Sequence, residues 1–283
     1  YRVESGGQYG TAGSGASNSC VFVEPSACGV PQVYPDGVSV KLTFNAPSFI
    51  GGWFRGRMRN PQIQVTPVNK NVNKISVEAT PIQVPKMGVI KTIDKLEGQE
   101  KVWFGTRGGW GIKNGVATGA DASSTEGFKY LEHFRSQVKD SITGKSSTWF
   151  LTTINAGRGS GCLADSSKVQ GIVTTNSLVY DGSAPTFSGG FLNYKVGGLH
   201  YEEDGKTSFQ GSYDLVMRSD TARCLYGFSK APLNAIVSVT NDKGTKTTAT
   251  TVVSEKNGWL KMAAYGFTYS NKTIKVKISK KKK

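Results

Sequence analysis

Hydrophobic and polar residues alternate along many short stretches of this chain. In the first clear stretch, Val38, Val40, Leu42 and Phe44 alternate with polar residues, directly after a Pro-Asp-Gly sequence at 35–37. An alternation with a period of two is typical of a strand with one buried face, and Pro-Asp-Gly is a turn signal. The pattern therefore predicts a strand that starts at residue 38.

Similar stretches follow at short intervals, separated by turn signals such as the Asp-Gly pairs at 181–182 and 204–205. Strands are expected over residues 62–68, 74–82, 88–93, 102–105, 148–153, 171–180, 191–201 and 208–217. Many short strands separated by tight turns favour antiparallel pairing over a parallel sheet with crossover helices. The sequence thus predicts a mainly β, antiparallel, sandwich-like domain.

One segment departs from this pattern and has helical spacing. Ser123 and Glu126 stand in the order of a capping box, which starts a helix. Apolar residues then recur three or four positions apart, at Phe128, Leu131, Phe134 and Val138. We expect one helix near residues 124–139, with its apolar stripe packed on a sheet.

The chain divides into three segments by composition. Residues 1–35 are rich in Gly and Ser and are expected to be flexible. Residues 36–220 form the main β-rich domain. Residues 221–283 contain four further stretches of strand character, at 235–240, 245–253, 258–264 and 272–279, and predict a small Ig-like β-sandwich unit with a basic tail.

The composition is typical of a protein with a buried core and without a membrane-spanning helix. Of 283 residues, 37% are hydrophobic, which is enough for a buried core, and no apolar run is long enough to cross a membrane as a helix. The 35 glycines agree with a turn-rich β protein. No transmembrane segment is expected.

Four cysteines bear on the cellular compartment. They permit three pairings, of which Cys20–Cys28 with Cys162–Cys224 is the simplest. Their spacing does not fit a metal site, and the chain has only two histidines, so no metal or other cofactor is expected. Disulfides indicate a secreted or cell-surface protein. The alternative is four reduced thiols buried as small apolar side chains.

Charge is concentrated near the end of the chain. Nine lysines and no acidic residue lie between Lys256 and Lys283, and they supply +9 of the net charge of +15. Lys275 and Lys277 alternate with apolar residues, which places both on one face of a strand. This face could bind an anionic cell-wall or surface polymer, or the lysines could simply protect a sheet edge from aggregation. A nucleic-acid partner is not favoured, because no recognition motif accompanies the charge.

A second candidate anion or glycan contact combines arginines and aromatic residues. Arg55, Arg57 and Arg59 share one face of an extended strand, and Trp53 precedes them. Guanidinium groups in this arrangement could bind carboxylate or phosphate groups, or form ion pairs within the protein. Trp53 and Trp103 each precede a phenylalanine, so one ring of each pair could stack on a sugar; core packing of both rings is the alternative.

The last third of the chain resembles a family of uncharacterised secreted proteins of actinobacteria. The resemblance rests on the segments LNYKV at 192–196, GSYDLVMRS at 211–219, ARCLYGF at 222–228, EKNGWL at 255–260 and AYGF at 264–267. It implies an exported protein that faces the cell wall, and it implies no activity or catalytic residue.

No catalytic motif is recognisable in the sequence. The Gly-rich run at 157–161 does not fit a nucleophile elbow, because Arg158 stands where that motif has glycine. We therefore expect a non-catalytic, extracellular structural or binding protein that contacts anionic polymers or assembles into a homo-oligomer. The alternative is a secreted carbohydrate-binding or carbohydrate-active protein.

Overall fold

The computed structural model describes most of the chain and confirms a mainly β fold. The described residues are 2–5, 21–24, 27–30, 33–47, 52–92, 114–118, 128, 131–132, 135–154, 161–163, 168–227, 233–241, 246–247, 250–269 and 272–280. They divide into two compact units, one of Tyr1–Asp36 with Gly88–Thr118 and one of Gly37–Met87 with Gly119–Lys283. Each unit is described here by itself.

The smaller unit contains two small antiparallel sheets. One has the order β1 (Arg2–Ser5), β3 (Ala27–Val30), β2 (Val21–Glu24), and the other pairs β9 (Gly88–Thr92) with β10 (Asn114–Thr118). Three short strands therefore lie within residues 1–35, where the Gly/Ser-rich composition predicted a flexible segment. The expected strand at 102–105 lies outside the described residues.

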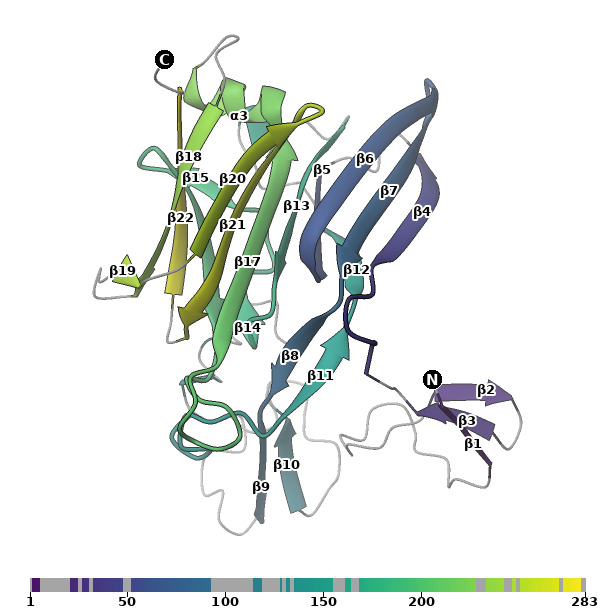
Figure 1. The fold of residues 1–283 in the computed structure, drawn as a ribbon, viewed down its shortest axis with the longest axis vertical. Helices are drawn as coiled ribbons and strands as arrows, with labels where there is room; N and C mark the ends of the chain where they lie inside the picture. The colour runs from purple at the N-terminus through teal and green to yellow at the C-terminus, as the bar shows by residue number, and fades with distance from the viewer. Residues whose placement is uncertain are drawn as a thin grey trace. The chain divides into compact units, whose positions relative to one another are not determined.

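A six-stranded sheet forms the middle of the larger unit (Figure 1). Its order is β12 (Phe150–Ile154), β5 (Gly52–Arg57), β13 (Val169–Thr175), β17 (Gln210–Arg218), β21 (Trp259–Thr268), β20 (Thr250–Lys256). All neighbours are antiparallel except β5 and β13, which are parallel. The predicted antiparallel architecture is confirmed.

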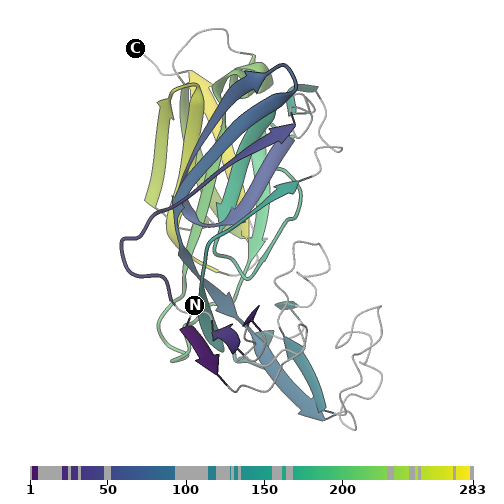
Figure 2. The same cartoon turned by 90° about the vertical axis from the view of Figure 1, so that its right-hand side faces the viewer.

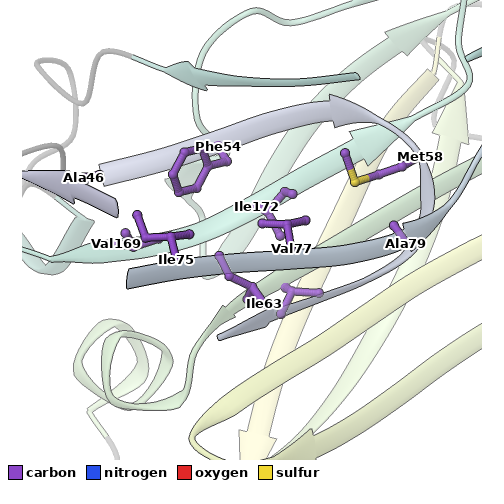
Figure 3. Packing of buried hydrophobic residues seen from close by; sticks show 10 residues of the cluster. Ala46, Phe54, Met58, Ile63, Ile75, Val77, Ala79, Val169 and Ile172 are labelled. Atoms are coloured by element: carbon purple, nitrogen blue, oxygen red, sulfur yellow. The ribbon is translucent and has the colours of Figure 1, made fainter. Parts of the chain in front are cut away.

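A three-stranded sheet covers part of one face of the six-stranded sheet. Its order is β4 (Val40–Pro47), β7 (Val72–Thr80), β6 (Arg59–Asn69), so β6 is an edge strand. Figure 3 shows the apolar cluster between these two layers, to which β7 contributes Ile75 and Val77 and the central sheet contributes Phe54 and Ile172.

A third sheet lies on the opposite face of the six-stranded sheet (Figures 1 and 2). It has the order β14 (Val179–Tyr180), β16 (Phe191–Gly197), β22 (Lys272–Lys280), β18 (Leu233–Asn241), β19 (Lys246–Thr247), and β15 (Thr186–Ser188) pairs with β16. A separate pair joins β8 (Ile82–Lys86) to β11 (Gly144–Thr148). Every residue of β13 is buried, since both faces of this strand are covered.

The C-terminal strands are placed differently from the prediction. They were expected to form a small Ig-like β-sandwich unit over 221–283. β18 pairs with β22 and β20 pairs with β21, but each pair also continues a sheet of the preceding segment, because β22 pairs with β16 and β21 pairs with β17. The alternating pattern predicts that each strand has an apolar face, but it does not say which strand lies next to it. These strands complete two layers of the larger unit instead of forming a separate sheet.

Helical structure is limited among the described residues. Phe128, Leu131, Glu132 and Arg135 are helical, in agreement with the helix expected near 124–139. The sequence pattern did not predict α3 (Ser219–Tyr226), which ends at Gly227 in the left-handed conformation. A disulfide joins Cys224 of α3 to Cys162 of the 3₁₀ helix η2 (Gly161–Leu163), as predicted. The other predicted pair includes Cys20, which lies outside the described residues.

We expect the double substitution Cys162→Ser/Cys224→Ser to lower the free energy of unfolding by about 2–4 kcal/mol. The bond closes a loop with a sequence separation of 62, and its loss frees the unfolded chain. Urea unfolding followed by tryptophan fluorescence measures the change, with Ser188→Ala on exposed β15 as the control. A loss no larger than that of the control would contradict a stabilising role for this bond.

Candidate functional site

Arg57 lies inside the larger unit. Only 1% of it is exposed, and its guanidinium group donates hydrogen bonds to the backbone oxygens of Thr175 (3.2 Å), Ser177 and Leu178 (3.5 Å). The group also stacks on the ring of Tyr180, 4.3 Å from its centroid. Arg57 therefore holds the segment after β13 and is not exposed to a ligand.

The predicted ridge of three arginines is not formed. Arg55 donates to the backbone oxygen of Gly182 at 2.8 Å and is half-buried. Arg59 is exposed and lies over the ring of Tyr265, 4.2 Å from its centroid. Arg55 and Arg57 share a face as predicted, because both guanidinium groups lie near the ring of Tyr180, at 5.8 and 4.3 Å from its centroid. Arg59 is separated from them, because β5 ends at Arg57 and β6 starts at Arg59 in another sheet.

The structure describes one of the two tryptophans that were predicted to offer a ring for stacking. Trp53 is buried with 1% exposed, which agrees with the core-packing alternative, and Trp103 lies outside the described residues. Trp149 is half-buried and donates from Nε1 to the backbone oxygen of Ala79 at 3.1 Å. These positions make Trp53 and Trp149 parts of the packing.

Lys275 and Lys277 lie on the outer face of the third sheet. Between and beside them, Ile274, Val276 and Ile278 are buried, as the alternation predicted. Lys277 is exposed and its Nζ lies 5.9 Å from the centroid of the Phe191 ring. The two lysines therefore present charge away from the core.

A hollow of about 660 Å³ extends along β6, and we call it the β6 groove. One side is the edge strand β6 and the other is the hairpin of β20 and β21. Apolar side chains in its lining are Ile63, Val65, Val216 and Trp259. Polar side chains in its lining include Asn60, Gln62, Gln64, Lys256, Asn257 and Lys261. The lining also contains Glu78, whose carboxylate lies 3.7 Å from Nζ of Lys41.

The chemistry of the β6 groove suits a polar, uncharged or anionic ligand with some apolar surface. Amide side chains both donate and accept hydrogen bonds, and lysines only donate. Trp259 is half-buried against the core cluster, and the Arg218 guanidinium lies 5.9 Å from its ring, so the ring is held in place. The groove therefore combines a fixed aromatic ring with hydrogen-bond donors and acceptors.

A buried carboxylate lies at one end of the β6 groove. Asp214 of β17 is 1% exposed, accepts a hydrogen bond from the hydroxyl of Tyr265, and lies 3.5 Å from Nζ of Lys261. It also accepts from the backbone N–H of Asn60 at 3.3 Å. Asn60 has a left-handed backbone (φ 58°), and its side-chain oxygen accepts from Lys261. These contacts connect β17, β21 and the start of β6.

Burial raises the pKa of Asp214, because the ionised carboxylate loses its hydration. The hydrogen bond from Tyr265 and the charge of Lys261 act in the opposite direction but do not compensate fully. Burial also raises the pKa of Tyr265, and the nearby Asp214 carboxylate adds to this effect. Among the described residues, no group of three His, Cys, Asp or Glu side chains could hold a metal ion.

Sequence reasoning missed the groove and the Asp214 cluster. The sequence feature that points to the groove is a local one. Gln62 and Gln64 alternate with apolar residues, which places both glutamines on the outward face of the strand. The other side of the groove comes from β20 and β21, about 190 positions later in the chain, and periodicity carries no information on which distant strands lie together.

No family model matches the sequence, and neither a curated protein nor a solved structure does. In the part of the chain that is described, no helix has the length and apolar character of a membrane span. The chemistry of the β6 groove is therefore the basis for a functional assignment.

We expect Asp214→Asn to become more stable relative to the wild type as the pH rises. The raised pKa means that folded Asp214 holds its proton more tightly than the unfolded chain does. Its stabilising contribution is therefore complete below the ordinary carboxyl pKa of 3.8 and is lost as the pH rises through the raised value. Asparagine has no such dependence. Urea unfolding of both proteins between pH 4 and pH 8 measures the difference, and a constant difference would contradict the prediction.

Proposed function

We propose that this chain is an exported, non-catalytic binding protein that holds an extended surface glycan in the β6 groove. The observation that carries this proposal is the lining of the groove, where Trp259 lies among four side-chain amides. The amides are Asn60, Gln62, Gln64 and Asn257.

A glycan fits this lining better than an apolar ligand does. Each sugar hydroxyl donates and accepts hydrogen bonds. A side-chain amide can pair with it in both ways, because its NH₂ group donates and its oxygen accepts. The C–H face of a sugar ring is apolar and can pack on the fixed ring of Trp259. The groove is open along the edge strand β6, which leaves room for a chain to enter and leave at its ends.

One observation supports the proposed export. The Cys162–Cys224 disulfide is compatible with an oxidising, extracellular compartment.

A second candidate function is contact with an anionic surface polymer through the outer face of the third sheet. Lys195 of β16 is exposed, and it lies on the same face as Lys275 and Lys277 of the neighbouring β22. This face would act as a flat cationic surface, whereas the β6 groove would select a ligand by shape and hydrogen bonding.

We expect wild-type protein to bind neutral or acidic oligosaccharides on a glycan array. The double variant Gln62→Ala/Gln64→Ala should bind them at least about tenfold more weakly, because two hydrogen-bonding groups are lost. Isothermal titration with the best oligosaccharide measures the dissociation constants. Both glutamines are exposed, so the variant should unfold at the same urea concentration as the wild type.

The matched control is Thr186→Ala/Ser188→Ala, which removes two exposed hydroxyls from β15, outside the groove. It should bind as the wild type does. Absence of glycan binding by the wild type, or equal binding by the groove variant and the wild type, would reject the proposal. A loss of binding after Lys275→Gln/Lys277→Gln alone would favour the second candidate instead.

A further inference from the structure

A second hollow of about 340 Å³ lies beside the β6 groove, and we call it the Arg59 hollow. Its lining includes Arg59, Gln83, Lys145, Ser212 and Tyr265. It belongs to the same compact unit as the groove.

The linings of the two hollows contain residues that are neighbours in the chain or share a contact. Asn60 lines the groove, and its neighbour in the chain, Arg59, lines the second hollow. Likewise Lys261 lines the groove and Tyr265 lines the second hollow, and both contact the same carboxylate, that of Asp214. Arg59 therefore lies next to the end of the groove that Asn60 and Lys261 line.

Arg59 is placed to bind an anion. Its guanidinium is exposed and oriented by stacking on Tyr265. Among the described residues, no carboxylate forms an ion pair with it, whereas Lys145 in the same hollow is paired with Glu202 at 2.9 Å. The guanidinium therefore has donors available for a planar, two-oxygen acceptor.

A buried hydroxyl adds a second, independent observation. Ser212 is 7% exposed and lines the Arg59 hollow, and its Oγ has no hydrogen-bond partner among the described residues. A buried hydroxyl without a partner is unusual, because leaving it unsatisfied costs free energy. Because the Oγ atom is itself buried, a ligand oxygen becomes its partner only when side chains at the edge of the hollow move slightly.

We infer that the Arg59 hollow binds a carboxylate carried by the glycan, so that the ligand is an acidic, uronic-acid-containing polymer. This inference rests on the proposed function. A carboxylate offers two oxygens in one plane, which match the planar, fork-shaped guanidinium of Arg59. The β6 groove selects the sugar chain, and Arg59 selects its charge.

The test compares each acidic oligosaccharide with its own methyl ester, which has the same sugar chain without the charge. The probes are oligogalacturonate, oligoglucuronate and oligomannuronate and their methyl esters, measured by isothermal titration. Wild-type protein should bind an acid form about tenfold or more tightly than its ester, since hydrogen bonds to charged groups are the stronger ones. Arg59→Gln should bind the two forms equally, with the affinity for the ester unchanged.

Two further variants separate charge selection from general effects. Lys206→Gln removes one exposed positive charge outside both hollows and should keep the preference for the acid. Ser212→Ala removes a hydroxyl that has no partner among the described residues, so the fold should be retained. It should weaken binding of the acid a few-fold and leave binding of the ester unchanged.

The outcomes distinguish this inference from the proposal on which it rests. Binding of ester and acid with equal affinity by the wild type overturns the inference and leaves the glycan groove standing. If Arg59→Gln still binds the acid more tightly than its methyl ester, the inference is likewise overturned and the glycan groove still stands. Absence of binding for every acid and every ester, together with a negative glycan array, overturns both.

Discussion

The larger unit depends on the burial of both faces of its central sheet. β13 is buried along its whole length, and β17 is buried at every position between its first and last residues. Two strands in this position need a covering layer on each side, which the three-stranded sheet and the third sheet provide (Figures 1 and 2). Close contact within the central sheet also requires a small residue: a side chain at Gly171 of β13 would collide with the ring of Trp53 on the neighbouring β5, 2.6 Å from its first atom. The layers therefore determine each other's positions.

Polar groups within this core have specific partners. The Arg57 guanidinium binds backbone oxygens of the segment that follows β13. In the same segment, the side chain of Asn176 accepts from the N–H of Ser212 at 2.8 Å and from the hydroxyl of Tyr269 at 2.7 Å. Buried polar groups are stabilising only when they are satisfied, so these contacts favour one arrangement of the segment over others. They hold the first residues of the third sheet against the central sheet.

The same layering produces the candidate site. On the central sheet, the buried residues of the apolar cluster come from β5, β13 and β17, so the three-stranded sheet covers only part of that face. Beyond β17, side chains of β21 and β20 are left beside the edge strand β6, and the β6 groove lies between them. Asp214, Lys261 and Asn60 join the two sides at one end. The site is thus a consequence of two sheets of unequal width.

Alternation of apolar and polar residues was sufficient to predict a mainly β fold, the outward position of Lys275 and Lys277 and a helical segment around Leu131, because these are local properties of the chain. Simple cysteine arithmetic also led to the Cys162–Cys224 pair. Strand partners were not predictable, and β18, β20, β21 and β22 were therefore assigned to a separate unit. The arginine ridge failed for the same reason: the chain leaves one sheet after Arg57 and enters another at Arg59. Only the tertiary structure brings β6 beside the β20–β21 hairpin, since that contact depends on the packing of layers and not on the period of any one strand.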